Sequence, residues 1–197
     1  NNFDMRNTWK GIRMGLPYAI STHSILLGDM VGTGDGSETT AIQTQYQGPS
    51  YLSNALDSSA IDAFFCAEPW NTKAVIEKRG SIFIRTKDLL PDHICCILVV
   101  REDFLLKQGD LVQSYLRLLT AANRFLSKNP GHSAKIQEMY TGVPATINEK
   151  VLRDGDISFQ DLTPDRSRIE KMMNLALATG VLDSPCNLDS FICTDMH

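Results

Sequence analysis

Ile61 to Ala74 reads IDAFFCAEPWNTKA, and the rest of the predicted fold is arranged around this stretch. The apolar run Ile61 to Cys66 has the length and aromatic content of a buried strand. Glu68-Pro69-Trp70 then ends the strand, so an acid and a large aromatic side chain follow its carboxyl end. Ligands bind at that end of the strands in open α/β sheets. Two interpretations stay open: the turn lines a ligand site, or Trp70 anchors the core and Glu68 is a solvated loop acid.

A helix is predicted directly after this turn, from Lys73 to Arg79, and Gly80 closes it. Asn71 and Thr72 are its candidate N-caps, because their side chains can accept a hydrogen bond from a backbone N–H of the first turn. The stretch therefore predicts a strand, a rigid turn and a helix in that order.

Strands and helices alternate through the first half of the chain and are joined by short loops, one of them Thr33 to Thr40. Further strands are predicted at Ile12–Leu16, Ala41–Gln47 and Ser81–Thr86, and further helices at His23–Val31 and Tyr51–Leu56. This alternation indicates an α/β fold with a mainly parallel sheet that is covered on both faces.

The second half of the chain is predicted to be almost entirely helical. It opens with Ile94 to Val100, ICCILVV, the most apolar run of the sequence, which predicts a central buried strand. The helices then expected are Asp103–Asn129, Ser133–Tyr140, Ile147–Arg153 and Thr163-Pro164 to Thr179, with a last turn at Asn187–Cys193. The change of character places a boundary near residues 94 to 102.

The composition excludes several classes of protein. The chain has 197 residues, 43% hydrophobic and 21% charged, with a net charge of −4 and no basic run. These values are typical of a globular protein and argue against a nucleic-acid partner or electrostatic membrane binding. No apolar segment approaches the roughly 20 residues of a membrane span, so we expect no direct membrane insertion.

The five cysteines form no disulfide framework, because their number is odd and their spacing fits none. Cys66, Cys95 and Cys96 lie in apolar runs, where a thiol behaves as a small hydrophobe and a reducing compartment is favoured. Cys95 and Cys96 would point to opposite faces of a strand, and with His93 they match no common zinc pattern. We therefore expect no metal site, no cofactor and no catalytic residues.

A hydroxyl-rich loop leads into the first predicted helix. Ser21 or Thr22 can cap that helix, and His23 stands in its first turn, where it could donate a hydrogen bond. Free N–H groups and the helix dipole make this end a candidate anion or carboxylate site. The alternative is that Ser21 and Thr22 only cap the helix and His23 is a surface residue.

Five motifs together resemble the substrate-binding proteins of ABC importers for nitrate, bicarbonate, sulfonates and taurine, and the nitrate/bicarbonate branch in particular. In chain order they are Pro17–His23, Gly48–Ser50, Ile61–Ala74, Pro91–His93 and Val99–Phe104. The resemblance covers essentially the whole chain. It implies a type II periplasmic-binding-protein fold, in which two α/β lobes joined by crossing strands clamp the ligand between them.

The resemblance also implies a domain organisation. Residues 1–94 would form the second α/β lobe, and residues 95–197 a crossing strand and a helical C-terminal segment that packs on the first lobe. Nothing in the chain matches the N-terminal part of the first lobe, and the chain begins NNFDMRNTWK, without an initiator Met or an apolar signal. The start therefore has the character of a processed or trimmed end, and half of the ligand cleft would be absent from this chain.

Candidate ligand-binding residues follow from the resemblance. Ser21, Thr22 and His23 match the loop that reaches the ligand from the second lobe, and Ala67 and Glu68 match the turn that lines the cleft. Trp70, by contrast, matches a position that packs. Where the nitrate-type pattern has a lysine, this chain has Cys96. The absence of that cation favours a sulfonate, a larger organic acid or a neutral ligand over nitrate or bicarbonate.

The function expected from the resemblance is the capture of a small anionic or polar solute for ABC-type import, with an ABC permease and an ATPase as partners. The protein would be periplasmic or anchored at the outer face of the inner membrane, and would close by a hinge motion. One alternative is a cytoplasmic ligand sensor in a transporter or signalling protein. Another is an enzyme similar to thiamine-pyrimidine precursor synthases, for which no base and nucleophile are visible.

Overall fold

The computed structural model describes residues 9–32, 42–91, 93–157, 159 and 162–193. The predicted loop Thr33–Thr40 and Asp92 lie outside these residues. The chain divides into two compact units: a first unit of Asn1–His93 and Ser167–Cys186, and a second unit of Ile94–Arg166 and Asn187–His197. The division after His93 falls near the expected boundary, but Ser167–Cys186 groups with the first unit. That residues 95–197 pack on a further lobe stays a prediction.

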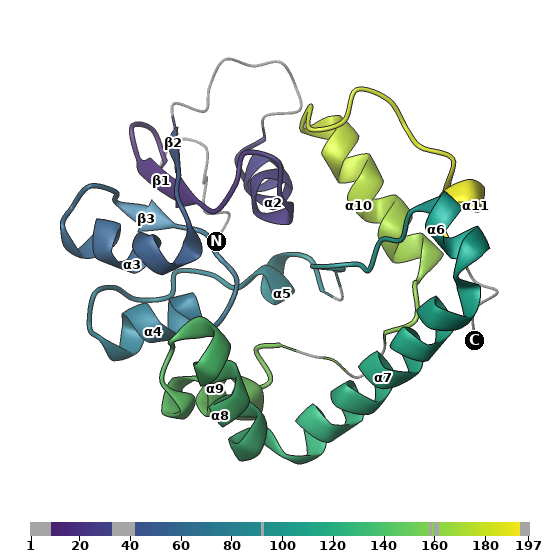
Figure 1. Ribbon diagram of the computed structural model, residues 1–197. Helices are drawn as coiled ribbons and strands as arrows, with labels where there is room; N and C mark the ends of the chain where they lie inside the picture. The colour runs from purple at the N-terminus through teal and green to yellow at the C-terminus, as the bar shows by residue number, and fades with distance from the viewer. Residues whose placement is uncertain (1–8, 33–41, 92, 158, 160–161, 194–197) are drawn as a thin grey trace. The chain divides into compact units, whose positions relative to one another are not determined.

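The first unit is built around a parallel sheet with the strand order β2-β1-β3 (Figure 1). Its strands are β1 (Arg13–Leu16), β2 (Gln43–Tyr46) and β3 (Ala63–Phe64). Although β3 is short, backbone hydrogen bonds from Asp62 N to Arg13 O and from Phe65 N to Gly15 O extend its pairing with β1. The predicted strand over Ile61–Cys66 is confirmed in its central part, and the prediction of a parallel sheet is confirmed.

Helices cover both faces of this sheet, as predicted. On one face Met14 and Leu16 pack against Leu27 and Val31 of α2 (Thr22–Val31). On the other face Ile61 and Cys66 pack against Leu52 and Ala55 of α3 (Pro49–Asp57), with Trp70 beside them. The first unit also contains α4 (Trp70–Ile76), α5 (Thr86–Leu89) and most of α10 (Arg166–Ala178).

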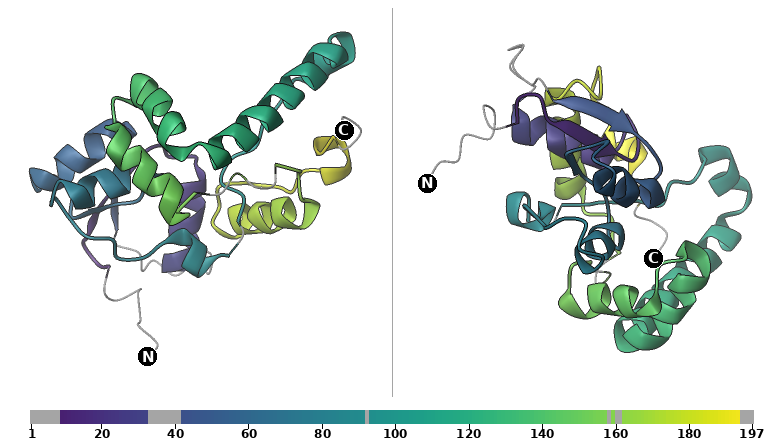
Figure 2. Two further views of the ribbon diagram at one scale, coloured as in Figure 1. Left: turned by 90° about the horizontal axis from the view of Figure 1, so that it is seen from below. Right: turned by 90° about the vertical axis from the view of Figure 1, so that its left-hand side faces the viewer.

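The second unit is helical, as expected. Its helices are α6 (Glu102–Lys107), α7 (Gly109–Lys128), α8 (Pro130–Thr141), α9 (Ala145–Asp154) and α11 (Leu188–Phe191). Helices α8 and α9 lie side by side (Figure 2). Asn148 of α9 is fully buried, and its side-chain amide donates to the carbonyl oxygen of Val143, in the connection between the two helices, at 2.9 Å. In the described residues no helix is both long and apolar enough to cross a bilayer.

Two predicted strands are wrong. Ser81–Arg85 has no regular structure and Thr86 begins helix α5. Ile94–Val100 is neither a strand nor buried, since Ile97 is 47% and Val99 69% exposed. An apolar run becomes a strand only when a neighbouring strand takes up its hydrogen bonds. Among the described residues, the parallel sheet extends from β2 to β3 and pairs with neither run.

Candidate functional site

The N-terminus of α2 is closed by the side chain of Ser21. The Ser21 hydroxyl oxygen accepts a hydrogen bond from the backbone N–H of Ser24 at 3.2 Å. The hydroxyls of Ser21 and Ser24 both donate to the carbonyl oxygen of Tyr18, at 3.1 and 2.9 Å. Ser21 is therefore the cap, as one of the two expected candidates, and Thr22 is the first helical residue. These bonds fix the loop and place His23 in the first turn.

His23 is not a fully exposed surface residue. Its imidazole is half-buried and lies edge-on against the ring of Phe65, with ring centroids 5.3 Å apart and planes at 84°. Burial lowers the pKa of His23 below its ordinary value, and the nearby charge of His93 lowers it further. A neutral imidazole carries one N–H donor and one nitrogen acceptor, so His23 can donate to a ligand without adding charge.

Glu68 is held in the turn between β3 and α4 by two groups. Its carboxylate accepts a hydrogen bond from the backbone N–H of Thr72 at 3.0 Å, and it lies 3.7 Å from the guanidinium of Arg85. The side chain of Glu68 is only 8% exposed, so the interpretation as a solvated loop acid is wrong. The Glu68–Pro69 peptide bond is cis.

Helix α4 begins earlier than predicted, at Trp70, and its N-cap position is Pro69. Asn71 and Thr72 are therefore not the caps. The side-chain amide of Asn71 donates to the carbonyl oxygen of Cys66, and the Glu68 carboxylate accepts the backbone N–H of Thr72 in the first turn. Trp70 packs against the core residues on the α3 side of the sheet, which confirms the packing role that was expected of it.

Two sets of contacts, one through His23 and one through Glu68, involve five residues of the first unit. The ring of His23 contacts the ring of Phe65, and the charge of His93 affects the pKa of His23. Glu68, which follows Phe65 by three residues, lies next to Arg85. Arg85 and His93 flank α5, and the Nδ1 of His93 lies 3.0 Å from the carbonyl oxygen of Leu90. We call His23, Phe65, Glu68, Arg85 and His93 the His23 cluster.

The predicted residues fall partly within this cluster. His23 and Glu68 belong to it, and Ser21 and Thr22 adjoin it at the start of α2. Ala67 is exposed and stands in the turn immediately before Glu68. Cys96 belongs to the second unit and is exposed.

Sequence reasoning missed Phe65 and Arg85. Phe65 lies in an apolar run in which every residue suits a core, so nothing distinguishes it there. Arg85 lies in a segment that was predicted to be a strand. The signal that could have found Arg85 is the acid itself, since a nearly buried carboxylate needs a cation or donors nearby. No group of three or more His, Cys, Asp or Glu side chains in the described part of the chain is placed to hold a metal ion.

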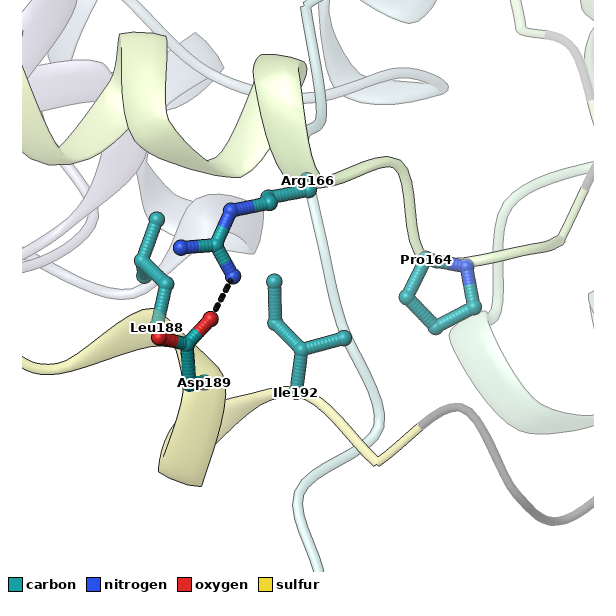
Figure 3. Close-up of a pocket in the computed structure, with 5 residues that line it drawn as sticks. All are labelled: Pro164, Arg166, Leu188, Asp189 and Ile192. Carbon is teal, nitrogen blue, oxygen red and sulfur yellow. Dashed lines mark hydrogen bonds and ion pairs between the residues drawn. The ribbon is translucent and has the colours of Figure 1, made fainter.

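The second unit has an open pocket of its own, lined by Pro164, Arg166, Leu188, Asp189 and Ile192 (Figure 3). The guanidinium of Arg166 lies 2.6 Å from the carboxylate of Asp189, and the dashed line in Figure 3 marks this ion pair. Both charges are engaged with each other and largely exposed, so the pocket offers no uncompensated charge from this pair. None of the predicted site residues lines it.

Comparison with known proteins decides the family. The model of the NMT1-like family matches residues 3–141, more than two thirds of the chain. The chain belongs to the NMT1-like family. Among similar proteins, the nitrate/nitrite binding protein NrtA of Nostoc sp. PCC 7120 is 22% identical over 168 residues, which are 83% of this NMT1-like chain and 38% of the relative.

A second relative is the bicarbonate transport ATP-binding protein CmpC of Synechocystis sp. PCC 6803, 22% identical over 126 residues. This match covers 64% of the NMT1-like chain and 19% of CmpC. The chain thus spans less than two fifths of either relative. The resemblance to nitrate- and bicarbonate-type transport proteins that the five motifs predict is confirmed by these matches and by the family.

Solved structures confirm the fold class. The ligand-binding component of an ABC-type import system from Staphylococcus aureus, solved with zinc bound, superposes with a TM-score of 0.78 at 21% identity. The superposition covers 95% of this chain and 62% of the Staphylococcus aureus chain. The alkanesulfonate-binding protein SsuA of Xanthomonas axonopodis pv. citri, bound to MOPS, gives a TM-score of 0.69 at 18% identity. This superposition covers 92% of this chain and 62% of the SsuA chain. The NMT1-like chain therefore has the α/β fold of import-system binding proteins.

Proposed function

We propose that this NMT1-like chain is the solute-capturing part of an ABC import system, which hands a small anionic or polar solute to a permease and its ATPase. The observation that carries the proposal is that His23 follows β1 and Glu68 follows β3 of the parallel sheet, and that Arg85 pairs with Glu68. Ligands bind at such strand ends in α/β proteins. The binding components among its structural neighbours support this role.

The charges of the cluster favour a particular kind of solute. His23 is neutral near pH 7 because burial and His93 lower its pKa, and the charge of Arg85 is opposed by Glu68. A small inorganic anion would find little net positive charge here. A sulfonate held by neutral donors, a larger organic acid or a neutral polar solute suits the arrangement better.

The proposed ligand-binding residues of the first unit are Ser21, Thr22, His23, Ala67 and Glu68, and Cys96 of the second unit stays a separate prediction from the resemblance. In this proposal His23 and the start of α2 donate hydrogen bonds to the solute. Glu68 positions Arg85 and orients the polar edge of the solute. Capture by this mechanism breaks no bond, so no catalytic residue is assigned. The site of action would be outside the cytoplasmic membrane, in the periplasm or at the membrane's outer face.

The regulatory-sensor alternative is less favoured. The structural neighbours are binding components, and the match to the ATP-binding protein CmpC covers only 64% of the chain. The complete gene would discriminate the two roles. A secretion signal or lipid-attachment motif would support import, and an adjoining ATPase or kinase domain would support sensing.

The test is calorimetric titration of the complete gene product with nitrate, bicarbonate, taurine, alkanesulfonates and pyrimidines. We expect saturable binding of at least one solute, with a sulfonate or organic acid ahead of nitrate. His23→Gln should weaken that binding by about 10-fold or more, since one hydrogen bond to a ligand is worth about 1–2 kcal/mol.

The matched control is His132→Gln. His132 of α8 makes the same kind of edge-on contact, with Phe125 at 5.5 Å, but lies in the second unit and is not a candidate site residue. It should leave affinity unchanged. Absence of binding to every solute in the panel, or equal losses from the two His variants, would contradict the proposal.

A further inference from the structure

Cys95 and Cys96 are adjacent in sequence and close in space. Their sulfur atoms lie 3.8 Å apart, and both residues are exposed. Consecutive side chains of a strand point to opposite faces, which would separate the two sulfurs. Because Ile94–Val100 is not a strand, that restriction is lifted and the two thiols face each other.

We propose that Cys95 and Cys96 form a vicinal dithiol that is converted reversibly to a disulfide by small-molecule disulfides. This proposal does not depend on the solute-binding function. It concerns a covalent modification site on the exposed segment Ile94–Val100, and the sulfur positions alone carry it.

The two thiols have different parts in the reaction. Although Cys95 is exposed as a residue, desolvation of its sulfur raises the pKa of Cys95 to about 11, and the charge of Cys96 adds to the effect. The raised pKa makes Cys95 the poorer nucleophile, so we assign the first attack to Cys96. Cys95 is then the resolving group.

The reaction with oxidised glutathione is balanced as follows. The Cys96 thiolate attacks one sulfur of the reagent, breaks its S–S bond and releases one glutathione thiolate. Cys95 then gives its proton to solvent and attacks the Cys96 sulfur, which breaks the mixed disulfide and releases the second glutathione thiolate. The released proton and the proton lost earlier by Cys96 convert the two thiolates to thiols. The two cysteines lose two electrons in total, and the reagent gains them.

The geometry also explains why the bond should be reversible. Consecutive Cα atoms across a trans peptide are about 3.8 Å apart, which is less than the roughly 4.4–6.8 Å of ordinary disulfides. A bond between neighbours is therefore strained, and strain makes disulfides easier to reduce. A small thiol should restore the dithiol.

The other cysteines provide internal controls. Cys66 is buried in the core, and burial raises its pKa to about 12, so it should not react in the folded protein. Cys186 and Cys193 are exposed, and the sulfur of Cys186 lies 3.6 Å from that of Met173. Neither has a second cysteine beside it in the sequence, so each should stop at the mixed disulfide.

The test treats the folded protein with oxidised glutathione, then alkylates it and maps its peptides by mass spectrometry. We expect the peptide with Cys95 and Cys96 to lose two hydrogens and both alkylation sites, while Cys193 keeps a glutathione adduct. Brief treatment with reduced glutathione should restore both sites. Phenylarsine oxide should bridge the same two sulfurs and block the oxidation.

Cys95→Ser should arrest the reaction at a glutathione adduct on Cys96, and Cys186→Ser should leave the vicinal disulfide unchanged. Circular dichroism verifies that each variant is folded, and the wild-type peptide map decides the question even where a variant is not. Stable glutathione adducts on both neighbours of the wild-type protein, or alkylation of both after oxidation, would overturn the proposal.

Discussion

The carboxylate of Glu68 accepts the backbone N–H of Thr72 at 3.0 Å, so the acid that follows β3 secures the first turn of α4. The same carboxylate lies 3.7 Å from Arg85. Glu68 therefore has a structural role whether or not a solute is bound. Its substitution must be assessed for stability before any loss of binding is ascribed to a lost ligand contact.

Glu68→Ala should destabilise the protein by about 1–3 kcal/mol. It removes the carboxylate at the start of α4 and leaves the N–H of Thr72, a buried residue, without its acceptor. Glu68→Gln keeps an oxygen acceptor for this N–H and should lower the free energy of unfolding by less than Glu68→Ala does. Urea denaturation measures both. Glu170→Ala, at an exposed position of α10, is the control and should stay within about 0.5 kcal/mol of the wild type.

The lowered pKa of His23 predicts a loss of stability in mild acid. Below the ordinary imidazole pKa of 6.5, the unfolded chain binds a proton at His23 while the folded chain still resists it. Stability should therefore fall as the pH drops from 6.5 towards the lower folded value. The loss should be smaller in His23→Gln, which cannot titrate.

Urea midpoints of the wild type, His23→Gln and His132→Gln, measured as a function of pH, test this expectation. In His132→Gln the urea midpoint should change with pH as steeply as in the wild type. If His23→Gln loses stability in acid as steeply as the wild type, the neutral imidazole of His23 is not the cause.

A second pH effect belongs to the edge of the sheet. The carboxylate of Asp62 accepts hydrogen bonds from the guanidinium of Arg13 at 2.6 Å and from the backbone N–H of Arg13 at 2.9 Å, and these bonds lower the pKa of Asp62 from 3.8 to about 2. The unfolded chain binds more protons between these values, so stability is lost as the pH falls from 3.8 to about 2. Asp62→Asn should remove this part of the acid sensitivity, as measured by urea midpoints across that range.

Apart from the wrong strand Ser81–Thr86, the sequence predicted the sheet and helices of residues 12–79 well because their signals are local. The apolar alternation of Met14 and Leu16 marks a strand, and Ser21 marks the start of a helix; both patterns depend on neighbours a few residues away. The motifs after the strands led to His23 and Glu68 for the same reason. The segment Ile94–Val100 failed because a strand needs a distant partner, which no local pattern supplies.

The role of Glu68 could be predicted only in part. Its place after a strand gave the position, but the sequence does not show that Arg85 folds back towards it or that Thr72 donates to it. The contact of His23 with Phe65 is likewise between residues 42 positions apart in the sequence. Side-chain partners brought together by tertiary structure are the part that sequence reasoning could not supply.

Gly15 of β1 is the position where the sheet tolerates no side chain. A Cβ at Gly15 would lie 2.7 Å from the side chains of both Leu52 and Ile61, and 3.3 Å from the Cβ of Phe64. Leu52 and Ile61 are buried core residues, so neither can move away freely. Gly15→Ala should therefore destabilise the protein by about 1–3 kcal/mol, as expected for an overpacked core.

Gly109→Ala is the matched control for this substitution. A Cβ at Gly109, at the start of α7, meets nothing within 4 Å. Alanine there restricts the unfolded chain and suits a helix, so stability should rise by about 0.4–1 kcal/mol. Urea denaturation of both variants checks the prediction. If Gly15→Ala is as stable as the wild type, the α3 face of the sheet is packed more loosely than these distances indicate.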